Sequence, residues 1–193
     1  MVDINQRIDE AAWTLFTQRG YTQVTMDDIA AELGMSKKTL YAAIPSKEAL
    51  LHRLVQARLE EAETYTAQIV DNPDLSAYEK LRSLPAYGLS QMAMIQPVLL
   101  ADVRRHAPDT WAAIETTRDR LINERVGVVI HEGMARGELR DDLNPEVVQS
   151  VLYHSLRGVI TGALPITDPL RFARLLETTM LLLYSGLAKR EAP

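Results

Sequence analysis

The chain has 193 residues, of which 47% are hydrophobic and 24% are charged, with a formal net charge of -5 and no cysteine. This balance is typical of a globular protein and excludes a disordered chain, and the lack of cysteine excludes disulfides and thiolate metal sites. The N-terminal segment lacks the apolar run of a signal peptide, and the uncharged stretch at 178–188 is too short to cross a bilayer. We therefore expect a cytoplasmic protein without a membrane span.

The first fifty residues predict a series of short helices. Apolar residues recur at helical spacing between positions 4 and 16, and Gly20 suits the end of this first helix. Thr25 followed by Asp28 resembles a capping box, which predicts a short second helix that Gly34 ends. Ser36 suits the cap of a third helix at about 37–44.

Longer helices are predicted for the rest of the chain. Pro45 separates the third helix from a long fourth helix that begins at Lys47. Further breaks occur at 71–74, 97, 107–109, 137, 144–145 and 163–169, and no strand alternation is present. We predict an all-α fold of about nine helices, with a three-helix module at 1–46 and a larger C-terminal helical bundle at 47–193.

The second and third helices have the features of a helix-turn-helix. This motif needs a small residue where its helices cross, a glycine in the turn, and apolar residues that fix the interhelical angle. Ala30 and Gly34 fill the first two roles, and the apolar positions are Ile29, Leu33, Met35 and Leu40. The third helix is then free to enter a DNA groove.

The charge near this motif is unevenly distributed. Residues 1–50 hold five bases and seven acids, yet the stretch 35–47 contains three lysines and no acid. Its hydroxyls and cations suit phosphate and base-edge contacts. We predict DNA contacts by Thr25, Ser36, Lys37, Lys38, Thr39, Tyr41 and Lys47. Lys37 and Lys38 are best placed to reach guanine edges, and which of them reads a base stays open.

The N-terminal fifty residues resemble the signature of TetR-family transcriptional regulators. The matching segments are Ala11-Ala-Trp-Thr-Leu-Phe, Gly20-Tyr, Val24-Thr-Met-Asp-Asp-Ile-Ala, Leu33-Gly-Met-Ser-Lys-Lys-Thr-Leu-Tyr and Ser46-Lys-Glu-Ala-Leu. The chain departs from the family at Ala43 and Ile44, so neither is assigned a DNA contact. The resemblance implies that the remaining helices form a dimerisation and effector-binding domain.

Residues of this second domain offer candidates for both roles. An apolar effector cavity is predicted from Tyr87, Met92, Met94, Trp111, Tyr153 and Phe172, although such residues also suit plain core. Ser155, Gly158 and Gly162 would let helices approach closely, either at a dimer interface or within one subunit. The four histidines, His52, His106, His131 and His154, are too widely spaced for a metal site, and no cofactor is expected.

The helix-turn-helix and the family resemblance together predict a ligand-responsive repressor that binds a palindromic double-stranded operator as a homodimer. The resemblance implies that a small-molecule effector of unknown identity releases it. No nucleophile elbow, dinucleotide turn or phosphate loop occurs, so an enzyme is not expected. An alternative is an interaction protein of the same fold that acts through a protein partner. A third and weaker candidate is an all-α enzyme or small-molecule carrier.

Overall fold

The computed structural model describes residues 3–84, 97–161 and 169–189, and within these ranges the secondary structure is helical apart from one isolated bridge between Leu139 and Ala188. Residues 77–84 are helical. The other helices are α1 (Ile4–Arg19), α2 (Met26–Glu32), α3 (Lys37–Ala43), α4 (Lys47–Val70), α6 (Pro97–His106), α7 (Pro108–Arg120), the π-helical η1 (Leu121–Val126), α8 (Gly127–Ala135), α9 (Pro145–Thr161) and α10 (Pro169–Leu187). The predicted all-α class is confirmed.

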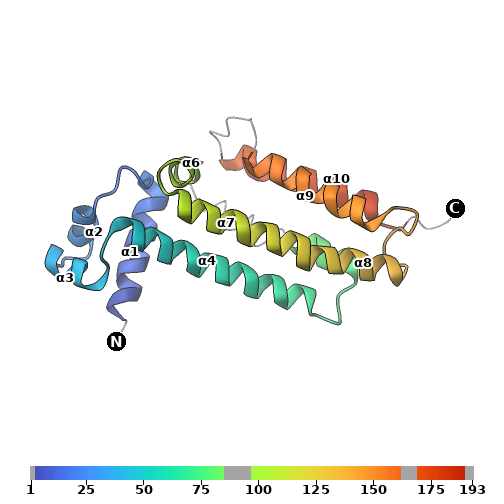
Figure 1. The fold of residues 1–193 in the computed structure, drawn as a ribbon, viewed down its shortest axis with the longest axis horizontal. Coiled ribbons are helices and arrows are strands. Elements are labelled where there is room, and N and C mark those ends of the chain that lie inside the picture. The colour runs from blue at the N-terminus through green and yellow to red at the C-terminus, as the bar shows by residue number, and fades with distance from the viewer. Residues whose placement is uncertain (1–2, 85–96, 162–168, 190–193) are drawn as a thin grey trace. The chain divides into compact units, whose positions relative to one another are not determined.

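The described residues pack into two compact units. Figure 1 labels the helices that belong to them. The first comprises residues 3–60 and 97–115, and the second comprises 61–84, 116–161 and 169–189. Each unit has its own apolar core. The predicted domain boundary after residue 46 stays a prediction. None of the helices in the described ranges is long and apolar enough to span a membrane.

Helices α1 to α4 and α6 all contribute apolar residues to the core of the first unit. Helix α1 buries Ile8 and Phe16, and α6 adds Leu99 and Val103. The ring of Phe16 meets the ring of Tyr21 edge-on, with centroids 5.5 Å apart. This single core gives α2, α3 and the start of α4 a common support.

An ion pair between helices adds to this support. The guanidinium of Arg53 on α4 lies 2.6 Å from the Asp9 carboxylate on α1, and both side chains are partly shielded from solvent. The Arg58 guanidinium lies over the ring of Trp13, 5.1 Å from its centroid. Helix α4 is therefore held against α1 by its charged side chains as well as by its apolar ones.

One long helical run contains a change of helix type that the sequence did not indicate. Residues 108–135 were expected between breaks at 107–109 and 137, and the structure keeps them helical but winds Leu121–Val126 as a π-helix. Gly137 ends the run with a φ of +68°. The π segment widens one turn locally, a feature that hydrophobic spacing does not reveal.

Gly133 on α8 allows a close approach to the helix at 77–84. A Cβ atom placed on Gly133 would overlap Ala77 and would lie 2.9 Å from the Leu139 side chain. Real Cβ atoms do not approach other atoms so closely, so any side chain here would push these segments apart. The absence of a side chain at this position therefore sets their packing distance.

We predict that Gly133→Ala lowers the free energy of unfolding by about 1–3 kcal/mol, the usual effect of overpacking a core. Adding Ala77→Gly should recover part of this loss because it removes the closest overlap. Urea unfolding at one fixed protein concentration measures both variants. An unchanged midpoint for Gly133→Ala would contradict the close packing described above.

Candidate nucleic-acid interface

Helix α2 begins with the capping box that the sequence predicted. The Thr25 hydroxyl accepts a hydrogen bond from the Asp28 N–H (3.2 Å), and the Asp28 carboxylate accepts from the Thr25 N–H (2.8 Å) and hydroxyl (2.6 Å). These bonds stabilise the charged carboxylate and hold the pKa of Asp28 below its ordinary value. The hydroxyl of Thr25 is thus already engaged within its own helix cap.

The turn after α2 closes with the two hydrogen bonds of a Schellman motif. The Met35 N–H donates to the Ala30 carbonyl (3.0 Å), and the Gly34 N–H donates to the Ala31 carbonyl (3.1 Å). Gly34 has a φ of +62°, a left-handed conformation that other residues adopt only at a cost. The glycine predicted in the turn therefore has a defined backbone role.

Helix α3 is short and presents most of its residues to solvent. Ser36 caps it, since its hydroxyl accepts from the Thr39 N–H (3.1 Å) and lies 2.8 Å from the Thr39 hydroxyl. Leu40 is fully buried in the core of the first unit. Lys38 and Tyr41 are exposed.

Two residues at the end of α3 differ from the other outward positions. Ala43 is partly buried against the core, and Ile44 after it is buried. The Ile44 N–H donates to the Leu40 carbonyl (3.0 Å) and so ends α3. This inward placement agrees with leaving them out of the predicted DNA contacts.

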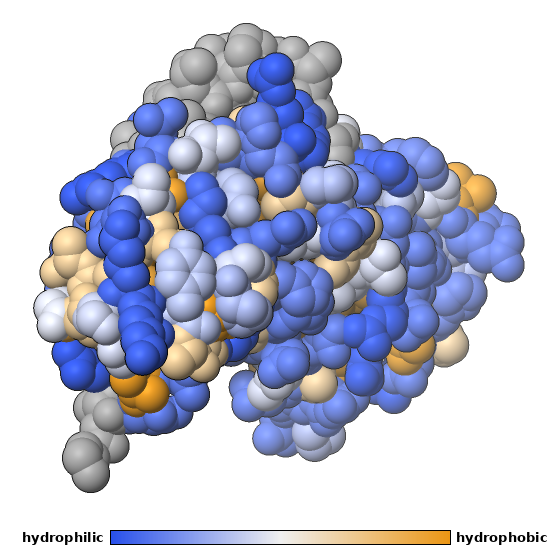
Figure 2. Space-filling view, turned by 60° about the vertical axis from the view of Figure 1, so that its left-hand side comes forward, coloured by the Kyte–Doolittle hydropathy of each residue, from blue (hydrophilic) through white to orange (hydrophobic). Residues whose placement is uncertain are grey.

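The two lysines of α3 differ in their surroundings. The Lys37 ammonium lies 2.5 Å from the carboxylate of Asp27 on α2. The hydrogen bond and charge of that carboxylate raise the pKa of Lys37 above its ordinary value. Lys38 makes no hydrogen bond or ion pair within the described part of the chain. Figure 2 turns the side that carries α1 to α3 toward the viewer and shows a mostly hydrophilic surface.

Lys47, the third predicted cation, points into the loop between α1 and α2. Its ammonium donates to the carbonyls of Tyr21 (3.0 Å) and Val24 (2.8 Å) and lies 4.3 Å from the centroid of the Tyr21 ring. Burial lowers the pKa of Lys47, although the charge of Asp102 opposes this shift. The sequence did not indicate this structural role, because a lysine in an acid-free stretch reads as a surface cation.

The same loop is held from a second direction by α6. The Asp102 carboxylate accepts hydrogen bonds from the Thr22 N–H (2.9 Å) and the Thr22 hydroxyl (2.8 Å). Residues 21–24 therefore lie between a cation of α4 and an anion of α6. This fixes the loop from which α2 begins.

The comparisons with known proteins agree with this geometry. Residues 8–54 match the model described as bacterial regulatory proteins of the tetR family. The uncharacterized HTH-type transcriptional regulator YvaF of Bacillus subtilis is 26% identical over 191 residues, which cover 97% of this chain and 97% of that protein. The chain is therefore similar to TetR-family transcriptional regulators, and its residues 8–54 match the model of that family. Proteins of this family regulate transcription and are not enzymes, and α2 and α3 form the DNA-binding helix-turn-helix.

Two solved structures share the fold of this chain. A TetR transcription regulator from Haloarcula marismortui superposes with a TM-score of 0.75 at 20% identity and covers 96% of this chain and 98% of that one. A transcriptional regulator from Saccharomonospora viridis in complex with choline gives a TM-score of 0.67 at 21% identity, with the same two coverages. At these identities the likeness supports the fold alone.

The structure describes only part of the predicted effector cavity. Tyr87, Met92 and Met94 lie outside the described residues, as does the side chain of Phe172. Trp111 is partly buried against the core of the first unit, and Tyr153 belongs to α9 in the second unit. The Tyr153 hydroxyl accepts a hydrogen bond from Arg157 (2.8 Å). The effector cavity stays a prediction.

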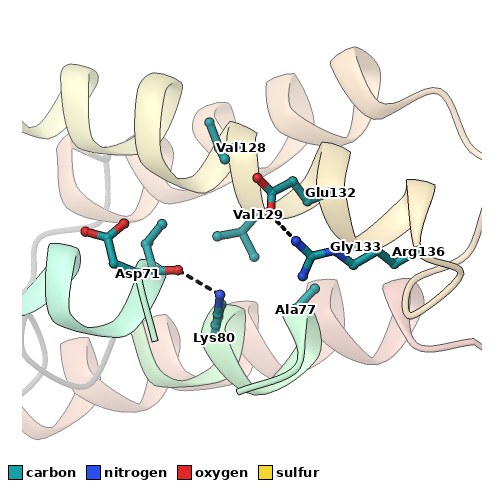
Figure 3. A pocket seen from close by; sticks show the side chains of 9 residues that line it. Asp71, Ala77, Lys80, Val128, Val129, Glu132, Gly133 and Arg136 are labelled. Carbon is teal, nitrogen blue, oxygen red and sulfur yellow. Dashed lines mark hydrogen bonds and ion pairs between the residues drawn. The ribbon is translucent and has the colours of Figure 1, made fainter. Parts of the chain in front are cut away.

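The second unit does contain a small pocket between α8 and the end of α4 (Figure 3). Its volume is about 90 Å³, and the lining includes Asp71, Ala77, Lys80, Val129, Glu132 and Arg136. The buried Lys80 ammonium donates to the carbonyl of Val70 (2.7 Å), the last residue of α4, and so caps that helix. None of the predicted effector residues lines this pocket, which is smaller than the usual site for a drug-sized ligand.

The predicted dimer residues lie along one helix as far as they are described. Ser155 is half-buried, Gly158 is exposed with open space where a Cβ would lie, and Gly162 is outside the described residues. Large apolar side chains are exposed on the same helix, at Val147 (59%) and Val151 (48%) of α9, and on α10, at Leu181 (64%) and Leu182 (69%). The sequence pattern does not distinguish these four residues, because the spacing of apolar residues alone does not show which helix face is covered.

We predict different effects on stability for two lysine variants that remove the same charge. Lys47→Met should lower the free energy of unfolding by about 1–2 kcal/mol, since two carbonyls lose their donor. Lys38→Met should change it by less than about 0.5 kcal/mol, as expected for an exposed residue without partners. Urea unfolding measures both, and equal stabilities for the two variants would contradict the structural role of Lys47.

Proposed function

We propose that the chain is a ligand-responsive repressor that binds a palindromic operator as a homodimer. The carrying observation is the outward face of α3, which is anchored by Leu40 and capped by Ser36. A helix held in this way is able to lie in the major groove with its first residues against base edges. The proposed contacts are those predicted from the sequence, namely Thr25, Ser36, Lys37, Lys38, Thr39, Tyr41 and Lys47.

Some of these residues already make hydrogen bonds within the protein, and these bonds limit how they could contact DNA. The Ser36 hydroxyl accepts from the Thr39 N–H and is still able to donate its hydrogen to a phosphate. The Thr25 hydroxyl donates its only hydrogen to the Asp28 carboxylate, so it would contact a phosphate only after that bond opens. The Lys47 ammonium has three N–H donors and gives two of them to carbonyls, which leaves one for a phosphate. Lys38 is exposed and has no ion-pair partner within the described residues, so its ammonium is available for a phosphate.

The exposed apolar side chains of α9 and α10 support the homodimer. Val147 and Val151 are four residues apart and share one face of α9, and Leu181 and Leu182 are adjacent on α10. Large exposed apolar side chains gathered on neighbouring helices mark interaction surfaces. Gly158 would let a partner helix approach closely. We propose that two copies pair through α9 and α10 in an isologous interface.

A dimer explains how an effector would control DNA binding. Two recognition helices enter successive major grooves only when they lie about 34–36 Å apart. A small molecule that binds in the C-terminal helices and favours another distance between the two recognition helices would lower operator affinity. The complex of a fold neighbour with choline supports small-molecule binding by this fold, without indicating the ligand of this chain.

We predict a steep salt dependence of DNA binding. A duplex selected from a random pool should be bound by two copies, and six to ten phosphate contacts should give a slope of about -5 to -9 for log affinity against log salt. Fluorescence anisotropy at salt concentrations from about 50 to about 300 mM measures this slope. The screening of exposed charges becomes much stronger over this range. A flat response, or selection of no duplex at all, would contradict the proposed function.

We also predict that Leu182→Glu produces a monomer. Burying a carboxylate in the proposed interface is unfavourable, and a single reading head should lose about 100-fold or more in operator affinity. Val128→Glu introduces the same charge at an exposed apolar residue of α8 and is the matched control. Sedimentation and anisotropy measure both, and a Leu182→Glu protein that remains dimeric would exclude this interface.

A further inference from the structure

The first turn of α3 contains two lysines, of which one is in an ion pair and the other is not. Lys37 is paired with Asp27 across the helix-turn-helix, with the ammonium 2.5 Å from the carboxylate, while Lys38 has no such partner within the described residues. The side chains of Lys37 and Asp27 are 64% and 57% exposed. The pair therefore lies on the surface of the module that contacts DNA.

Folding stability does not account for this pair. Exposed ion pairs contribute little, because solvent screens the charges and two flexible side chains must be ordered. Asp28, the neighbour of Asp27, already supplies the carboxylate that caps α2. The position of Asp27 instead matters for DNA, since it places a negative charge beside the cation that would meet the duplex.

A phosphate and a base edge compete differently for Lys37. Every duplex offers phosphates regardless of its sequence, so a free Lys37 would strengthen binding to all duplexes equally. The Asp27 carboxylate occupies the ammonium and repels an approaching phosphate. A guanine edge, by contrast, carries no formal charge and presents acceptors only where the sequence is right.

We propose that Asp27 sets the sequence specificity of this helix-turn-helix by withholding Lys37 from phosphates, so that Lys38 carries the sequence-independent charge contact of α3. The Lys37 ammonium leaves the ion pair, or donates a second hydrogen bond while it stays paired, only for a base edge of the correct sequence. This inference needs only the DNA-binding motif of the family and does not depend on the effector, the dimer or the palindrome.

The test is Asp27→Asn, which keeps the size of the side chain and removes its charge. With a scrambled 30-base-pair duplex, the salt slope should become steeper by about 0.9 for each bound copy, and affinity at 0.1 M salt should rise about eight-fold per copy, as one added counterion release requires. Affinity for a duplex selected by the wild-type protein should rise less. The ratio of specific to non-specific affinity therefore falls.

Two further variants separate the ion pair from general charge. Glu32→Gln removes the same charge from the exposed end of α2 without contacting Lys37, and it should leave the slope nearly unchanged. Lys37→Gln in the Asp27→Asn background should abolish the gain in non-specific affinity. Urea unfolding of each variant confirms that the fold is intact.

Three results would overturn the inference. If Asp27→Asn lowers affinity for the selected duplex and leaves the scrambled duplex unchanged, Asp27 aims Lys37 at a base instead of restraining it. If Glu32→Gln gives the same gain, only net charge matters. If Lys37→Gln does not abolish the gain, Lys37 is not the residue released. The repressor proposal fails separately, by a flat salt response of the wild-type protein.

Discussion

The burial of Leu40 is the constraint on which the DNA-binding surface depends. Helix α3 has seven residues, all of them described, and Leu40 alone is fully buried among them. One anchored side chain sets the rotation of so short a helix, and the Schellman turn at Gly34 sets its direction relative to α2. The outward positions of α3 follow from these two restraints, so the reading surface is a consequence of packing behind it.

Local signals made much of this module predictable. The capping box at Thr25, the glycine at 34 and the cap at Ser36 each depend on residues within a few positions of one another, and the structure confirms all three. The all-α class followed from helical spacing that was interrupted by proline and glycine at the right places. Such features are visible in a sequence because the backbone satisfies them locally.

Contacts between distant residues were not predictable in the same way. Lys47 stands next to Ser46 in an acid-free stretch, yet its ammonium serves carbonyls that lie 23 and 26 residues earlier. Asp102 reaches Thr22 across 80 residues, and the pairing of Lys37 with Asp27 requires the angle between two helices. The exposed faces of α9 and α10 depend on which neighbours cover them. These properties arise only after the chain has folded.

The shared core of the first unit has a consequence for dissecting the protein. Apolar residues of α6, including Leu99 and Val103, complete the same cluster as Phe16 and Leu50. A fragment cut after residue 46 would therefore expose the inner side of its own helices to water, and it would tend to aggregate or unfold. A minimal DNA-binding fragment of this chain must carry α6 with it, joined through a linker, although more than thirty residues of sequence separate α6 from the first part of the unit.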